Sequence, residues 1–113
     1  MLQIRFTREA AEDIRALPKN VRNYLKKEIQ KLAADPFGPS LELREPLEAW
    51  RSYHWGNYRI IFRVFGDLET IAIAAVGKRR PGLQTDVYRK LERLVREGKL
   101  AEKVLRAIKE LRW

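Results

Sequence analysis

The residues of this sequence that could do chemistry near neutral pH are one histidine and a group of basic residues. His54 is the single histidine and cysteine is absent, so we expect neither a thiolate nucleophile nor an ordinary zinc site. An imidazole titrates where proton transfer is easiest. The basic group is the stretch 77–82 (GKRRPG), which follows an apolar run and predicts a loop at a strand end, a common place for functional groups. No metal or other cofactor is expected.

The overall charge favours an anionic partner. Lys and Arg number 24 against 15 Asp and Glu, a formal net charge of +9, which suits nucleic acid or an acidic protein. Much of this excess falls in residues 89–113. A well-solvated basic surface would have the same composition. The longest uncharged apolar run, residues 71–76, is too short to cross a bilayer, and charged residues interrupt the N-terminus. We therefore expect a cytoplasmic protein without membrane contact.

Hydrophobic periodicity predicts the elements that position these groups. Apolar residues alternate over 2–6, as in a half-buried strand. Thr7 is expected to cap a short helix over 8–17, and Pro18 separates it from a longer helix that ends near Ala34. Because the break is short, the two helices should form an antiparallel hairpin.

Three strands should follow as a meander. They cover about 50–55, 58–65 and 71–76, with turns at 56–57 and 66–67. Further helices are expected from Asp86 to about 98 and from about Leu100 onward. The order predicts one α+β domain over residues 1–113, with residues 89–113 as a helical C-terminal extension. Its small antiparallel sheet would contain the N-terminal strand and the meander, with the helical hairpin on one face.

Three motifs in a fixed order resemble the RelE/ParE toxin superfamily. They are WRSYHWGNYRIIFRV at 50–64, IAIAAVGKRR at 71–80 and DVY at 86–88, and the resemblance covers about residues 1–95. It implies a RelE-like microbial RNase fold and a toxin neutralised by a cognate antitoxin. RelE-like members cut mRNA in the ribosomal A site without a metal. ParE-like members share the fold, lack the cleavage residues and poison DNA gyrase.

The resemblance also assigns roles to three residues. Metal-free RNA cleavage uses the 2′-hydroxyl as nucleophile; it needs a base, cations that stabilise the phosphorane and an acid for the leaving oxygen. Arg59 and Arg79 match phosphate-binding arginines, and Tyr88 matches a tyrosine near the attacking hydroxyl. A phenol needs neighbouring cations to act as a base. Each residue also has a purely structural alternative. Arg59 could pair with a surface acid, Arg79 could belong to a solvated basic loop, and Tyr88 could be a packed aromatic residue.

His54 is a departure, because compact RelE-like toxins carry lysine or arginine on this strand. It could replace a lysine as base or acid, or serve only in packing. Arg51, Lys78 and Arg80 are candidates for contact with the RNA backbone. Base stacking on the aromatic residues at 53, 55 and 58 is conceivable, but packing is the favoured interpretation.

Three functions follow from this sequence. We favour an endoribonuclease that cuts ribosome-bound mRNA, with mRNA, the ribosome and an antitoxin as partners. The second is a ParE-like inhibitor of DNA gyrase. The reason for this alternative is that the 50–54 strand lacks the lysines of compact RelE-like toxins. The third is an inactive relative that binds RNA or an antitoxin.

Overall fold

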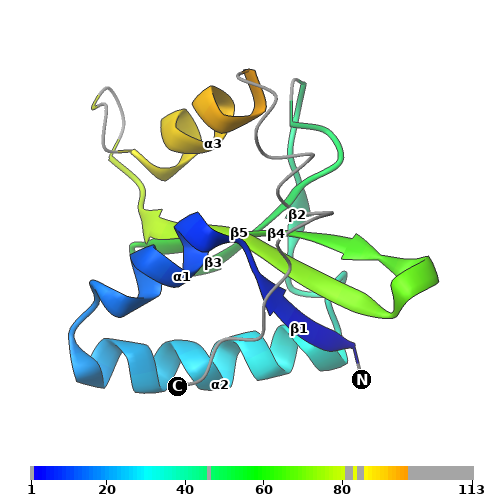
Figure 1. The fold of residues 1–113 in the computed structure, drawn as a ribbon, viewed down its shortest axis with the longest axis horizontal. Coiled ribbons are helices and arrows are strands. Elements are labelled where there is room, and N and C mark those ends of the chain that lie inside the picture. The colour runs from blue at the N-terminus through cyan, green and yellow to red at the C-terminus, as the bar shows by residue number, and fades with distance from the viewer. Residues whose placement is uncertain (1, 46, 81–82, 84–85, 97–113) are drawn as a thin grey trace.

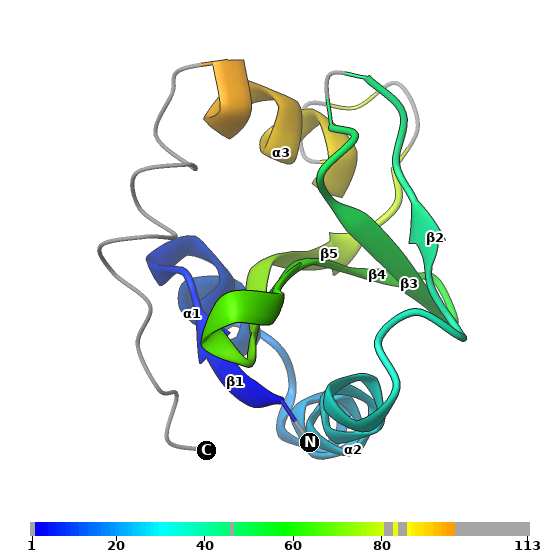
Figure 2. The same ribbon diagram turned by 90° about the vertical axis from the view of Figure 1, so that its right-hand side faces the viewer.

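A five-stranded sheet forms the centre of the protein, with helices on both of its faces (Figures 1 and 2). The computed structural model describes residues 2–45, 47–80, 83 and 86–96. The strand order is β1-β5-β4-β3-β2. The strands are β1 (Gln3–Phe6), β2 (Leu41–Glu42), β3 (Arg51–Trp55), β4 (Tyr58–Phe65) and β5 (Thr70–Lys78). The helices are α1 (Arg8–Arg15), α2 (Lys19–Ala34), the 3-10 turn η1 (Gly66–Leu68) and α3 (Val87–Arg96).

Thr7 begins the helical hairpin, as predicted. Its hydroxyl oxygen accepts the backbone N–H of Ala10 at 3.1 Å and donates to the carbonyl of Ala74 at 2.9 Å. Ala74 lies where the β4–β5 register shifts, between the pairs Ile61↔Ala75 and Phe62↔Ile73. The extra residue of β5 therefore presents its carbonyl to Thr7, and one buried side chain joins the start of α1 to the centre of the sheet.

The sheet confirms the α+β class, with one difference in strand direction. The meander β3–β4–β5 is antiparallel, but β1 runs parallel to β5, in the register Gln3↔Thr70 to Phe6↔Ile73. The helical hairpin supplies the crossover that brings β1 and the meander into one sheet. The short strand β2, which pairs with β3, was not predicted, because two exposed residues carry no readable alternation.

Alternation along β4 divides the core between the two faces of the sheet. Ile60 and Phe62 pack with the helical hairpin, whereas Ile61 packs on the other side with α3 and the segment that contains Leu47. Figure 2 shows the sheet between α2 and α3. Strand β5 is buried on both sides from Thr70 to Val76, which confirms the predicted central strand. The expected last helix, from about Leu100, lies outside the described residues.

Within the described ranges, no helix combines the length and the apolar character that a membrane crossing would require.

Candidate functional site

The tight hairpin between β3 and β4 places two of the predicted site residues side by side. Gly56 has φ 57°, the conformation that the first position of a two-residue hairpin turn needs and that glycine adopts without strain. The turn pairs Trp55 with Tyr58 and, one step further, His54 with Arg59. His54 and Arg59 therefore project from one face of the sheet as direct cross-strand neighbours.

Arg59 carries a buried nitrogen that the fold does not satisfy. Its Nη1 donates to the carbonyls of Gly56 at 3.1 Å and Tyr58 at 2.9 Å. Its Nε is buried and has no hydrogen-bond partner. A buried polar group without a partner costs on the order of 1–3 kcal/mol. The Nε of Arg22 is also buried and unpartnered, so this feature points to a ligand at Arg59 only together with the position of Arg59 beside His54. An incoming anion is the kind of ligand that would satisfy it.

Helix α3 covers the same face and brings Tyr88 to the sheet. The start of the helix packs over Gly77, which lies opposite Arg59 in β5; a Cβ added to Gly77 would meet the Cβ of Val87 at 3.4 Å, an ordinary van der Waals contact. The Tyr88 hydroxyl lies 2.8 Å from Ser52 Oγ, and Ser52 is 1% exposed. The guanidinium of Arg79 lies over the Tyr88 ring, 6.0 Å from its centroid, within cation–π range.

A single carboxylate holds the loop after β5 and the start of α3 together. Asp86 Oδ2 accepts the backbone N–H groups of Tyr88 at 3.1 Å and Arg89 at 3.4 Å, as an N-cap residue does. Asp86 Oδ1 accepts the backbone N–H of Arg80. Because Asp86 is buried, at 5% exposed, it fixes the position of Arg79 relative to Tyr88.

Electrostatics link His54 to both arginines. Partial burial of the ring lowers the pKa of His54 below its ordinary value of 6.5, and the positive charges of Arg59 and then Arg79 lower it further. His54 as a whole remains exposed to solvent, so this burial is slight, and the lowered pKa leaves the imidazole mainly neutral at pH 7, where it can accept a proton. The structure thus brings together His54, Arg59, Arg79 and Tyr88, which come from β3, β4, the end of β5 and α3.

Three other predicted residues lie outside this group. Arg51 points to the opposite side, where Nε donates to Ser40 Oγ at 2.7 Å and Nη2 to the Ser40 carbonyl at 3.0 Å. Lys78 lies over the Tyr58 ring, at 5.5 Å from its centroid, on the face of the helical hairpin. The structure gives Arg80 an exposed side chain and a backbone bond to Asp86.

Two residues of the site had no predicted role in it. Ser52 shares a strand face with His54 by simple alternation. The sequence signal that could have identified it is a small polar residue in a strand that is otherwise rich in aromatic residues. Asp86 was predicted as the start of a helix and as part of the DVY motif, without a contact to the preceding loop; its bond to Arg80 links residues six apart and leaves no sequence pattern. In the described part of the chain, no group of three or more His, Cys, Asp or Glu side chains forms a metal-binding cluster.

The fold is the one found in a class of protein, the toxins of the RelE/ParE superfamily. The model of the family described as the ParE toxin of type II toxin-antitoxin systems matches residues 4–81. The chain belongs to this family and is a toxin of a type II toxin-antitoxin system.

Individual relatives agree with this membership. A protein of Escherichia coli that carries the name RelE-like toxin protein is 28% identical over 87 residues, which are 76% of this chain and 88% of that protein. The toxin–antitoxin complex RelBE2 from Mycobacterium tuberculosis contains a chain with 26% identity and a TM-score of 0.65, over 69% of this chain and 98% of that one. The isolated E. coli RelE toxin has 19% identity and a TM-score of 0.63, over 84% and 99%, and shows a shared fold.

Proposed function

We propose that this toxin is a metal-independent endoribonuclease that cuts ribosome-bound mRNA. The observation that carries the proposal is the unpartnered, buried Nε of Arg59 beside His54, together with Arg79, whose charge also acts on His54. Two guanidinium groups on one face suit a phosphate, whose negative charge increases in the transition state.

The proposed reaction is an attack of the 2′-hydroxyl oxygen on the adjacent phosphorus. The O2′–P bond forms, the P–O5′ bond breaks, and the products are a 2′,3′-cyclic phosphate and a 5′-hydroxyl. Neutral His54 accepts the 2′-hydroxyl proton, Arg59 and Arg79 stabilise the phosphorane, and the Tyr88 hydroxyl gives a proton to the departing 5′-oxygen. This assignment differs from the one that the resemblance implies, which places Tyr88 near the attacking hydroxyl.

Geometry supports this division of roles between His54 and Tyr88. The Tyr88 hydroxyl contacts Ser52, and Ser52 lies two residues before His54 on the same strand, about 7 Å along it. An in-line displacement needs its base and its acid on opposite sides of phosphorus. His54 and the residue that Tyr88 contacts occupy different positions along β3, which supports placing the base and the acid on different sides of the phosphate.

A second candidate function is inhibition of DNA gyrase, which the match to the ParE family model favours. In either case we propose a cognate antitoxin as a partner, because the M. tuberculosis relative and an E. coli RelE relative have each been crystallised as toxin–antitoxin complexes.

The test is cleavage of mRNA in a cell-free translation mixture, mapped by primer extension. We expect cuts by the wild type, a loss of roughly 100-fold or more in Arg79→Ala and Arg59→Ala, and normal activity in Arg44→Ala, which removes the same charge from an exposed position. Arg59→Ala should fold normally by circular dichroism. Intact mRNA together with inhibited supercoiling by purified gyrase would refute the nuclease proposal and support the second candidate.

A further inference from the structure

A row of aromatic rings lies on the other face of the same sheet end. Trp55 and Tyr58 stack with ring centroids 5.4 Å apart, and Tyr24 of α2 lies 6.5 Å from Trp55. A lysine lies over each end of the row: Lys27 is 6.0 Å from the Tyr24 centroid, and Lys78 is 5.5 Å from that of Tyr58. These five residues are called the aromatic row below.

Packing does not account for the outer part of this row. Trp55 is partly buried against the core, but Tyr24 is 62% exposed. A large side chain so exposed contributes little hydrophobic free energy to folding, and much of its surface is accessible to a ligand. The row therefore combines an open aromatic surface with flanking cations.

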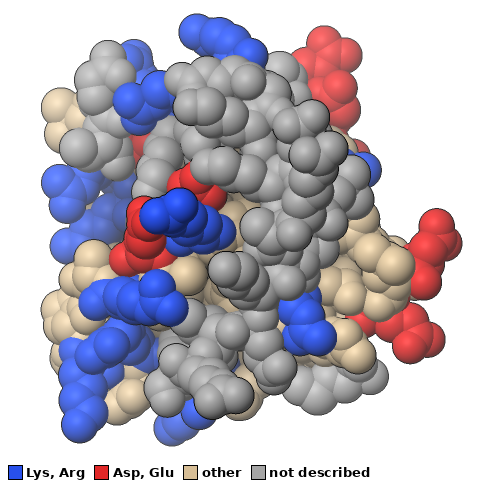
Figure 3. Space-filling model, viewed as in Figure 1, with Lys and Arg blue, Asp and Glu red and all other residues tan. Residues whose placement is uncertain are grey.

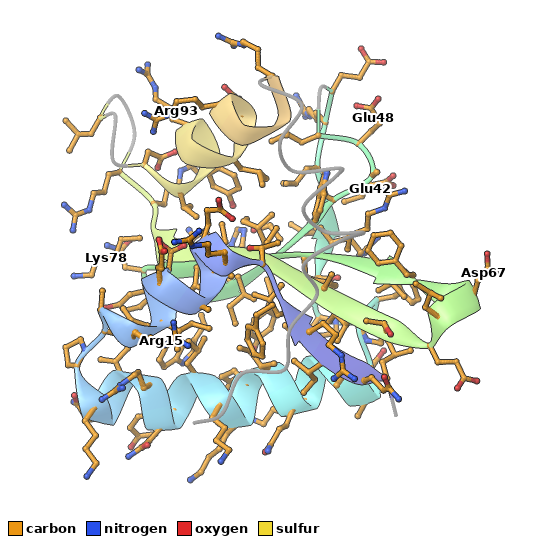
Figure 4. All side chains as sticks on the ribbon, in the orientation of Figure 1. Arg15, Glu42, Glu48, Asp67, Lys78 and Arg93 are labelled. Atoms are coloured by element: carbon orange, nitrogen blue, oxygen red, sulfur yellow. The ribbon has the colours of Figure 1, made fainter. Side chains whose placement is uncertain are left out.

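The charge around the row is positive. The stretch 19–27 (KNVRNYLKK) at the start of α2 has four basic residues and no acidic one. In Figure 3, basic residues gather along the side formed by the start of α2, and Figure 4 labels Arg15 and Lys78 there, with Asp67 at the opposite side of the molecule. The positive end of the α2 dipole adds to this potential.

Because side chains alternate along each strand, the aromatic row lies on the opposite face of the sheet from the candidate site. Trp55 follows His54, Tyr58 precedes Arg59 and Lys78 precedes Arg79, so each neighbour points to the opposite face. The hairpin tip at residues 56–57 is exposed, and a strand of nucleotides that rounds this tip would touch both faces. Two faces of one sheet end would then hold one RNA chain.

We infer that the aromatic row binds unpaired nucleotides of single-stranded RNA that lie beside the phosphate held by Arg59 and Arg79. Bases stack on Tyr24 and against the Trp55 edge, and Lys27 and Lys78 contact phosphates. Stacking needs splayed bases, so a duplex is a poor ligand. The identity of the RNA as the substrate strand rests on the proposed function; the binding surface itself does not.

The experiment uses the full chain and a fluorescein-labelled oligouridine whose 2′-hydroxyls are all methylated, so that it cannot be cut. Fluorescence anisotropy should give a roughly tenfold higher Kd for Tyr24→Ala and a nearly unchanged Kd for Tyr24→Phe, which keeps the ring. The matched control is Phe37→Ala, since Phe37 is 58% exposed and lies 5.2 Å from the Arg51 guanidinium; its Kd should equal that of the wild type. Lys27→Ala should lower the slope of log K against log salt by about 0.7.

Two results would overturn the inference: a Tyr24→Ala variant that binds as tightly as the wild type, or an RNA duplex that competes as well as the single strand. Failure of the proposed function looks different. If the wild type leaves mRNA intact while Tyr24→Ala still weakens oligouridine binding, the nuclease proposal fails and the binding surface stands.

Discussion

Asp86 offers the sharpest test of how the site is held together. Its two carboxylate oxygens do different work: Oδ2 caps α3 through Tyr88 and Arg89, and Oδ1 fixes the loop after β5 through Arg80. Loss of an N-cap costs about 1 kcal/mol, and loss of a charge-assisted hydrogen bond, here a partly buried one, costs about 1.5–3 kcal/mol. We expect Asp86→Ala to lower the free energy of unfolding by about 3 kcal/mol and Tm by about 12 °C.

The variant Asp86→Asn separates the helix cap from the bond to the loop. Asparagine is as good an N-cap as aspartate, but its amide has only one oxygen. The NH₂ group that replaces the second oxygen is a donor and cannot accept the other backbone N–H. We expect a loss of about 1–2 kcal/mol and slower RNA cleavage, because Arg79 is no longer held beside Tyr88.

Urea unfolding followed by circular dichroism measures both losses. Asp35→Ala is the control, because it removes a carboxylate that accepts the backbone N–H of Gly38 at 3.2 Å from an exposed position; it should cost less than about 1 kcal/mol. The reasoning is refuted if Asp86→Ala is as stable as the wild type, or if Asp86→Asn is as unstable as Asp86→Ala.

Three further predictions concern β3. The lowered pKa of His54 keeps the imidazole neutral down to below pH 6.5, so kcat/KM for cleavage should fall only in more acid solution. In His54→Ala this fall of kcat/KM at acid pH should disappear. A pH profile that still falls in the same way would exclude His54 as the base. Tyr53 donates to Glu28 Oε2 at 2.5 Å, and we expect Tyr53→Phe to cost about 1.5 kcal/mol in urea unfolding. This hydrogen bond raises the pKa of Tyr53 from 10.0 to about 12 and lowers that of Glu28 from 4.5, so the difference between wild type and variant should be full between pH 5 and 10. It should shrink as the pH rises toward 12 or falls below 4.5; a pH-independent difference contradicts the assignment. Ser52→Ala should slow cleavage at unchanged stability of the sheet, and Ser52→Thr, which keeps the hydroxyl for Tyr88, should restore the rate; equal rates in both variants would argue against a positioning role.

The sequence by itself determined much of the architecture. Alternation and turn residues predicted the meander, and Thr7 and Pro18 predicted the helical hairpin, because these signals depend on neighbours along the chain. The pairing of His54 with Arg59 also follows from a two-residue turn at 56–57. The faces of Lys78 and Arg79 follow from the same alternation, once β5 is known to continue to Lys78.

Only the tertiary structure decided which groups meet. The contact between Ser52 and Tyr88 joins residues 36 apart, and it depends on how closely α3 packs over Gly77. The parallel position of β1 depends on the crossover made by the helical hairpin, and the use of Arg51 in a bond to Ser40 depends on the path of the loop before β3. Such contacts arise from packing between distant segments, whose energies no local pattern records.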